Sequence, residues 1–111
     1  MPYIKNDGRR EALRNGESAQ TAGELNYQIF YHIKHNNYTE SLIGEFIEQF
    51  LTEKPNYQRY NDMTGALIRC YVEIKRRLKL ECDFLILIAA SYNDEIAKYE
   101  ELKVIENGDV E

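Results

Sequence analysis

The sequence predicts an all-α protein, a small oligomeric bundle of four or five helices. In four separate segments, apolar residues recur every three or four positions, which is the period of an α-helix. Residues that cap helices stand in front of most of these segments. Six Gly and two Pro in 111 residues are too few for a fold rich in turns. The length corresponds to one domain, residues 1–111.

Residues 1–20 are predicted to form a short N-terminal segment. A short helix can begin after Asp7 and end at Asn15-Gly16. The next helix spans residues 22–35, because Thr21 and Glu24 fit a capping box. In that motif the hydroxyl accepts the Glu24 N–H and the carboxylate returns to the backbone of the cap. One face of this helix carries Leu25, Ile29, His32 and Ile33.

Two further helices are predicted over residues 39–54 and 57–79. Thr39 and Asn56 are their expected N-caps, and Pro55 ends the first of them because proline cannot continue the hydrogen-bond ladder. The first has the clearest apolar stripe of the chain: Leu42, Ile43, Phe46, Ile47, Phe50 and Leu51. The second has a stripe of Tyr60, Met63, Leu67, Tyr71, Ile74 and Leu78.

Residues 80–90 fit either a buried strand or the beginning of a helix. The sequence offers no second strand to pair with them, and an unpaired buried strand costs free energy. A helix over residues 83–106 is therefore predicted, ended by Asn107-Gly108. A turn is placed at residues 79–83, because one helix from 57 to 106 would be about 75 Å long.

Charge and cysteine content limit the functional classes. The net charge is −5, and the acidic excess lies in the last third: residues 1–80 carry 12 basic and 10 acidic side chains, and residues 81–111 carry 2 and 9. Nucleic acid is not an expected partner of an acidic chain. Cys70 and Cys82 are expected to be reduced thiols in a cytoplasmic protein. No signal peptide is expected in residues 1–15, and no apolar run is long enough to span a membrane.

Several polar patterns contain the residue types of functional sites. Glu73 has Arg69, Arg76 and Arg77 as helix neighbours, so an ion-pair network is expected there. A metal shared by Asp62 and Glu73 of one chain is not expected, because eleven residues of helix separate them by about 16 Å, unless a second copy supplies the partner ligand. His32 and His35 have metal-ligand spacing but nothing that completes a site, and a buried structural role is expected for His32. No catalytic residue, metal ligand or cofactor is predicted.

The sequence resembles a family of small uncharacterised proteins of phages and bacteria. Members begin with MPYI and carry a (D/E)LNY segment, a helix of the type YxxINDVxGALE…ExYRR, and a C-terminal YEDxKIxENGDV block. The corresponding blocks here are Met1-Pro2-Tyr3-Ile4, Glu24-Leu25-Asn26-Tyr27, Tyr60-Asn61-Asp62-Met63-Thr64-Gly65-Ala66-Leu67, Glu73 with Arg76-Arg77, and residues 99–110. Two departures are Ile68-Arg69, where the family has an acidic residue, and a longer segment between Arg77 and Tyr99. The resemblance implies an origin and brings no established activity.

The function expected from these observations is a non-enzymatic phage or prophage accessory protein that works through protein contacts. Its candidate interaction residues are Tyr60, Asn61, Asp62, Glu73, Arg76 and Arg77. A twofold homodimer is expected, because residues 84–90 are apolar on every side and need cover on every side. Another phage or host protein is the other expected partner. The alternative is a small metal-dependent nucleotide phosphohydrolase that uses Glu45, Glu48 and Glu53, whose ExxE spacing is similar to that of all-α pyrophosphohydrolases.

Overall fold

The computed structural model describes residues 4–108 and confirms the all-α prediction, with no strand among them. The parts of the quoted sequence blocks at residues 1–3 and 109–110 lie outside this range. The number of helices is higher than the predicted four or five. The described chain forms six helices: α1 (Asp7–Arg14), α2 (Ala22–Lys34), α3 (Glu40–Glu53), α4 (Tyr57–Leu78), α5 (Phe84–Ser91) and α6 (Asn93–Asn107).

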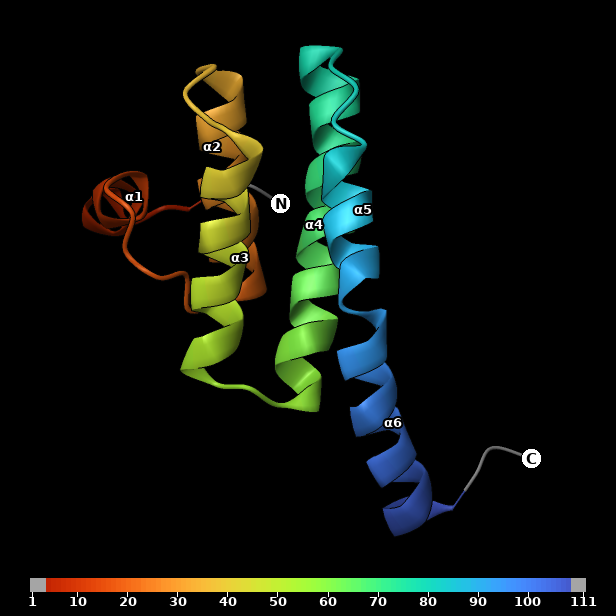
Figure 1. Ribbon diagram of the computed structural model, residues 1–111. Helices are drawn as coiled ribbons and strands as arrows, with labels where there is room; N and C mark the ends of the chain where they lie inside the picture. Colours follow the sequence, from red (N-terminus) through yellow and green to blue (C-terminus); the bar gives the residue numbers. More distant parts are fainter. Residues whose placement is uncertain (1–3, 109–111) are drawn as a thin grey trace.

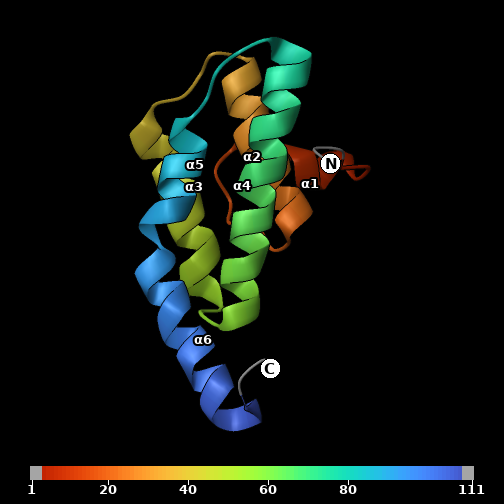
Figure 2. The ribbon, with the colours of Figure 1, turned by 90° about the vertical axis from the view of Figure 1, so that its right-hand side faces the viewer.

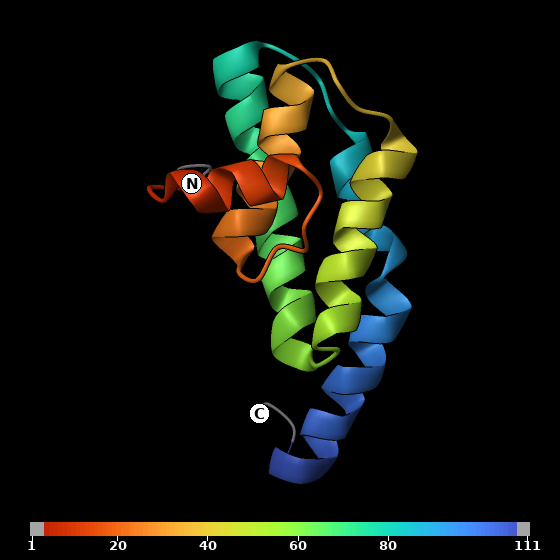
Figure 3. The same ribbon diagram turned by 90° about the vertical axis from the view of Figure 1, so that its left-hand side faces the viewer.

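The central element is α4, the longest helix. It packs against α2, α3, α5 and α6, and α1 packs against α2 (Figure 1). Figure 2 shows α5 and α6 following one another down the side of α4. Figure 3 shows α1 lying across α2 rather than along it. The bundle therefore consists of α2, α3, α4 and α5, with α1 and α6 attached at its margins.

The predicted apolar stripes of α2, α3 and α4 form the core. The buried residues of these stripes include Ile29, Phe46, Phe50, Leu67 and Ile74. His32 is also buried: its Nδ1 lies 2.8 Å from the carbonyl of Gln28, and its ring contacts Phe46. The structural role predicted for His32 is confirmed. In the α4 stripe Tyr60, Tyr71 and Leu78 are only partly buried, so they form the edge of the core.

The start of α2 differs in one detail from the predicted capping box. The Thr21 hydroxyl accepts the N–H of Glu24, as expected. The Glu24 carboxylate instead accepts the N–H of Gln20 and binds the Arg9 guanidinium through two contacts of 2.7 and 2.8 Å. Bidentate pairs of this kind are among the stronger charge-assisted hydrogen bonds. The Arg9 guanidinium holds the pKa of Glu24 below its usual value, and the pair fastens α1 to α2.

A buried arginine connects the 17–20 linker to the corner between α3 and α4. The Arg59 side chain is only 6% exposed and lies over the Phe50 ring. Its guanidinium donates to the carbonyls of Phe50, Gln20 and Ala19, at 2.7, 2.8 and 3.2 Å. The Phe50 carbonyl is one of the last four of α3, which have no partner within the helix. Arg59 therefore supplies a partner that the helix end lacks.

The predicted helix over residues 83–106 is wrong in one respect, because it is broken at Tyr92. The Tyr92 backbone (φ −96°, ψ 6°) leaves the helical region, and its N–H donates to the carbonyl of Ala89. The Tyr92 hydroxyl donates to the Glu48 carboxylate, and its ring contacts Tyr60. These contacts to α3 and α4 fix Tyr92 at the break. The predicted end of the last helix is confirmed: Gly108 has φ 84°, which favours glycine, and its N–H donates to Val104.

The last helix extends beyond the bundle. No residue of α6 is buried, and its lower half continues past the N-terminal end of α4 (Figure 1). The radius of gyration is 14.8 Å and the principal extents are 45 × 29 × 23 Å. A compact chain of this length has a radius of gyration of about 13 Å. The difference agrees with the projection of α6.

Candidate functional site

The six predicted interaction residues all lie on α4 but not at one place. Tyr60, Asn61 and Asp62 belong to its first two turns, whereas Glu73, Arg76 and Arg77 belong to its last two. Eleven residues of helix between Asp62 and Glu73 correspond to about 16 Å. The structure therefore divides the predicted set into two regions with different surroundings.

Tyr60 is part of an aromatic cluster that holds α6 against α4. Its ring lies 6.0 Å from that of Tyr92 and 5.4 Å from that of Tyr99, between centroids. Burial raises the pKa of Tyr60 above its usual value. The Tyr99 hydroxyl donates to the carbonyl of Pro55 at 3.4 Å. These contacts give Tyr60 a packing role.

The basic end of α4 is organised by local contacts. Arg76 donates to Glu73 at 2.8 Å, and the Arg77 guanidinium lies 5.0 Å from the centre of the Phe30 ring. Lys75 lies 3.6 Å from the Glu81 carboxylate. The expected ion-pair network is therefore only partly formed, since Arg69 makes no ion pair or hydrogen bond with any described residue.

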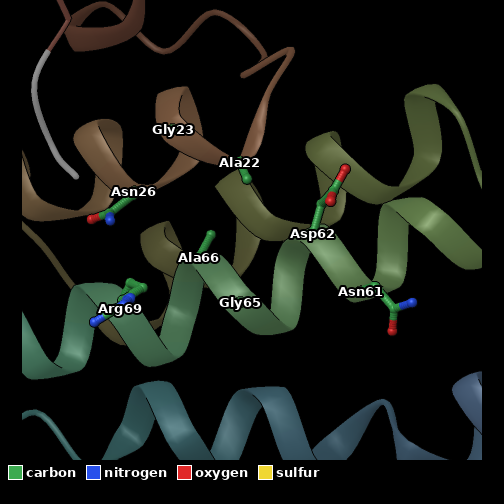
Figure 4. Close-up of a pocket in the computed structure, with 8 residues that line it drawn as sticks. All are labelled: Ala22, Gly23, Asn26, Asn61, Asp62, Gly65, Ala66 and Arg69. Carbon is green, nitrogen blue, oxygen red and sulfur yellow. The ribbon is translucent and has the colours of Figure 1, made fainter.

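A groove between α2 and α4, of about 240 Å³, contains two of the predicted residues, Asn61 and Asp62. We refer to it as the α2–α4 groove. Figure 4 shows α2 and α4 side by side, with the polar side chains spread along both helices. Small and polar residues line it: Ala22, Gly23, Asn26, Asn61, Asp62, Gly65, Ala66 and Arg69.

Asn26 is the most unusual residue of the α2–α4 groove. Its side chain is only 1% exposed, yet its Oδ1 atom has no hydrogen-bond partner among the described residues. Its backbone carbonyl, on the core side, lies 3.8 Å from the Cys70 sulfur. A buried acceptor without a partner costs free energy of about 1–3 kcal/mol. The same burial closes this atom to ligands in the groove as well as to water.

The charged groups of the α2–α4 groove lie at opposite ends. Arg69 lies beside Asn26, and Asp62 lies near the start of α2 (Figure 4). The Asp62 carboxylate accepts a 2.9 Å hydrogen bond from Gln58. At the start of α2, Thr21 accepts the N–H groups of Glu24 and Leu25, whereas those of Ala22 and Gly23 have no partner in residues 4–108. The groove thus offers one free guanidinium, one carboxylate and unpaired amide groups.

The acidic residues of α3 do not converge on a metal site. Glu45 and Glu48 line one shallow pocket, but the Glu48 carboxylate accepts a hydrogen bond from the Tyr92 hydroxyl. Glu53 accepts the side-chain amide of Gln20 at 2.9 Å. His35 is exposed and contacts the Tyr31 ring. Within residues 4–108 no group of three or more His, Cys, Asp or Glu side chains is arranged to hold a metal ion.

A second surface is apolar and lies on the C-terminal half of the chain. All eight large hydrophobic side chains that are exposed in the described residues belong to α4, α5, α6 or the loop after α4. We call them the C-terminal apolar surface: Ile68, Val72, Leu80, Ile86, Leu87, Leu102, Val104 and Ile105. Leu87 and Ile105 are 70% and 79% exposed. Exposed apolar side chains that gather in space are typical of a contact surface, and these eight side chains are the candidates for one in this protein.

The family model of a domain of unknown function (DUF6899) matches residues 1–110. The chain belongs to this family. The comparisons with curated proteins and with solved structures found no match. No described helix of this DUF6899 domain is long and apolar enough to cross a membrane.

Sequence reasoning identified Asn61 and Asp62 but missed the rest of the α2–α4 groove. The sequence predicts Arg69 to be a partner of Glu73, and Asn26 is distinguished only as part of the ELNY block. One signal was available, because Gly65 stands in the middle of a long helix, where glycine is unfavourable by about 1 kcal/mol relative to alanine. A Cβ atom built at Gly65 meets no heavy atom within 4 Å. The glycine is therefore not required by close packing of the helices.

Proposed function

We propose that the protein is a non-enzymatic accessory protein of phage or prophage type that acts in the cytoplasm through protein–protein contact. The observation that carries this proposal is the C-terminal apolar surface, which holds every exposed large hydrophobic side chain of residues 4–108. The resemblance of the sequence blocks to small phage and bacterial proteins supports the origin. The interaction candidates at the basic end of α4 border this surface in sequence.

The first partner in this proposal is a second copy of the chain, in a twofold dimer. Helix α5 supports it, because only Leu85 and Ala89 of this apolar segment are buried, whereas Ile86 and Leu87 remain exposed. On α4, Ile68 and Val72 are 46% and 42% exposed and lie one turn apart on the side away from the core. A second apolar face would remove these side chains from water.

Charge supports an antiparallel arrangement of the two copies. Helix α6 carries five acidic and two basic side chains and contacts the N-terminal end of α4 through Tyr99 and Tyr60. The basic end of α4 at Arg76 is sixteen residues from Tyr60, about 24 Å along the helix. The two charged regions therefore cannot meet within one chain. An antiparallel pairing of two α4 helices would place the acidic α6 of one copy near the basic end of the other.

Light scattering at micromolar concentration tests the dimer. The wild-type chain is expected to have twice the mass of the monomer, and Ile68→Glu and Val72→Glu are expected to shift it to monomer, because each places a charge in an apolar contact. Gln49→Glu, which adds the same charge on the exposed face of α3, is the matched control and is expected to leave the mass unchanged. A wild-type mass of one chain at about 100 μM, unchanged on dilution or in high salt, would refute the dimer.

A pull-down from infected or lysogenic cells tests the wider proposal. A partner retained by the wild-type chain and by Gln49→Glu, but lost with Ile68→Glu, is the expected result if the surface also serves another protein. If the chain is monomeric and no partner depends on Ile68 or Val72, the C-terminal apolar surface has no contact function and the proposal fails.

The alternative function is that of a metal-dependent nucleotide phosphohydrolase, and one observation supports it. Glu45 and Glu48 line the same shallow pocket on α3. Calorimetry with Mg²⁺ and Mn²⁺ at neutral pH, followed by a nucleotide hydrolysis screen, separates the two functions. Metal binding that is lost in Glu45→Gln, together with hydrolysis, would replace the interaction proposal with this one.

A further inference from the structure

We propose that a groove between α3 and α5 binds a basic amphipathic helix of a partner protein, with the apolar side of that helix on Leu87 and its basic side chains towards Glu45. The inference rests on the proposed function, because Leu87 belongs to the C-terminal apolar surface, and it states the chemistry of a partner other than a second copy. Three features of the groove carry it: an apolar wall, an acidic wall and a floor without large side chains.

The groove follows the line between α3 and α5, which run side by side and both pack against α4 (Figure 3). Two adjoining hollows of about 450 and 530 Å³ share Ser41 and Gly44 of α3, and we refer to them together as the α3–α5 groove. Phe84 lines it at the start of α5 and Tyr92 at the end of this helix. Eight residues of helix correspond to about 12 Å, so the groove is about two helical turns long.

The apolar wall of the α3–α5 groove belongs to α5. Leu87 and Ile88 follow Phe84 by three and four residues, so the three side chains share one face of the helix, and all three line the groove. Leu87 is 70% exposed, whereas its two neighbours on this face are partly buried. A second apolar surface laid over Leu87 would remove it from water. Ile86 is not among the residues that line the groove, so it remains available for the proposed dimer contact.

The acidic wall of the α3–α5 groove belongs to α3. This helix contains four glutamates and no lysine or arginine, and α5 contains no charged residue. Three of the glutamates, Glu40, Glu45 and Glu48, line the groove. The carboxylates of Glu40 and Glu45 form no ion pair with any described residue. A basic partner would therefore meet unpaired negative charges, whereas nucleic acid or an anionic membrane surface would be repelled.

The floor of the α3–α5 groove has no large side chain. Gly44 lies in the interior of α3, where glycine is less favourable than alanine. A Cβ atom at this position would contact nothing within 4 Å, and its φ is not positive, so neither packing within the chain nor backbone conformation requires glycine. Ser41, one turn earlier, is the other small residue of the floor. Glycine at such a place permits the close approach of another backbone.

A helix fits the α3–α5 groove better than an extended segment does. An extended segment binds by pairing its backbone with the exposed edge of a sheet, and residues 4–108 contain no strand. A helix satisfies its own backbone hydrogen bonds and presents side chains at spacings of three and four residues, as the apolar wall does. A partner helix with an apolar stripe and lysine or arginine beside it complements both walls.

Fluorescence anisotropy with a synthetic helical peptide tests the proposal on the full chain. The probe is a labelled peptide of about 14 residues, with leucine at i, i+3, i+4 and i+7 and lysine at the flanking positions. We expect a dissociation constant between about 1 and 100 μM at moderate salt concentration. The same peptide with glutamate in place of lysine is expected to bind at least about tenfold more weakly, because like charges then face each other.

Variants of the α3 side of the groove locate the binding site. Gly44→Leu fills the floor and is expected to weaken binding at least about tenfold. Glu45→Lys reverses one charge of the acidic wall and is expected to weaken it at least about threefold. Gly65→Leu on α4 is the matched control, since Gly65 is also a helical glycine with open space around it and lies outside the groove. Circular dichroism is expected to show unchanged helix content in all three variants.

Nuclear magnetic resonance identifies the contacted surface independently of affinity. The backbone amide signals of Ser41, Gly44 and Leu87 are expected to shift on titration with the lysine peptide. That of Ile105, which is exposed on the acidic helix α6, is expected to stay in place. Ile105→Ala is expected to bind the peptide like the wild type. Shifts confined to α6, or loss of binding in Ile105→Ala, would overturn the proposal, because the peptide then recognises that helix.

The proposal is also overturned if the lysine peptide does not bind at about 500 μM protein, if Gly44→Leu binds it like the wild type, or if the glutamate peptide binds equally well. A dimer that Gly44→Leu converts to monomer would overturn it too, since a second copy then occupies the groove. Failure of the proposed function is distinguishable, because its test uses Ile68 and Val72, which lie outside the groove. A dimer lost in Ile68→Glu, together with no peptide binding by the wild type, refutes this inference alone.

Discussion

At the scale of single residues, the charged side chains that matter most for the fold bind backbone groups, whether or not they also pair with another charge. Arg59 binds three carbonyls and no carboxylate among the described residues, and Arg9 reaches the Ser18 carbonyl as well as Glu24. Gln28 does the same in uncharged form, since its amide donates to the carbonyls of Leu13 and Glu17. These contacts hold α1 and the 17–20 linker, which have few apolar residues of their own, against the bundle.

Replacement of Arg59 by methionine tests this role. The variant keeps most of the apolar contact with Phe50 but leaves the Ala19 and Phe50 carbonyls without their donor, so we expect the free energy of unfolding to fall by about 3 kcal/mol. Arg59→Lys is expected to recover only part of the lost stability, because one ammonium group cannot reproduce the three hydrogen bonds that the planar guanidinium donates. Arg69→Met, at an exposed and unpaired arginine, is the control and should change stability by less than about 0.5 kcal/mol. Urea unfolding measures all three, and equal losses in Arg59→Met and Arg69→Met would contradict the role.

At the scale of the helices, the best-predicted elements have both a side-chain cap and a one-sided apolar stripe. Thr21, Thr39 and Asn56 each accept a backbone N–H three residues on, and the helices after them begin at Ala22, Glu40 and Tyr57. Helices α5 and α6 have no side-chain cap hydrogen bond. Their boundary at Tyr92 therefore had no local signal.

The apolar stripe of α3 makes Phe46→Ala a direct test of the core. Phe46 is 3% exposed and its ring lies 4.9 Å from that of His32, so we expect a loss of roughly 3–5 kcal/mol on truncation. Gln49→Ala, on the exposed side of the same helix, should change stability by less than about 0.5 kcal/mol. The comparison uses the midpoints of chemical unfolding. A loss below about 1 kcal/mol for Phe46→Ala would mean that the stripe is loosely packed.

At the scale of the whole molecule, the chain divides into a packed bundle and a projecting C-terminal helix. The buried residues belong to α1–α5 and their connections, while α6 contributes partly buried side chains such as Ile96 and Tyr99. Helix α6 carries five acidic and two basic side chains and lies away from the basic end of α4 (Figure 1). The acidic side chains of α6 therefore do not neutralise the basic residues in the last turn of α4 within the same chain.

Truncation before residue 93 tests whether the bundle is independent of α6. We expect the shortened chain to unfold cooperatively, with a loss of about 1–2 kcal/mol from the contacts of Tyr99 and Ile96. Deletion of residues 1–20 is the comparison, since it removes the buried Leu13 and Ala19 and the Arg9 contact to Glu24, and we expect a larger loss. Circular dichroism during thermal unfolding distinguishes the two. A gradual, non-cooperative transition after removal of α6 would show that the bundle needs it.

The sequence by itself determined the helices and most of the core, because both depend on local spacing. Periodicity placed Phe46 and Leu67 inside, and Thr39, Pro55 and Asn56 located helix boundaries to within one residue of those observed. His32 was also assigned correctly, since its position in the apolar phase of α2 is a local property. These features can be predicted without knowing which helices are neighbours.

Only the tertiary structure decided where the helices meet and which polar groups lack partners. The α2–α4 groove brings Asn26 next to Arg69, forty-three residues later in the chain, and no local pattern relates the two. The break at Tyr92 coincides with its contacts to Glu48 and Tyr60 on other helices. The exposure of Leu87 depends on how much of α5 the neighbouring helices cover. Local spacing fixes the face of a helix, whereas the neighbour that covers this face is set by long-range packing.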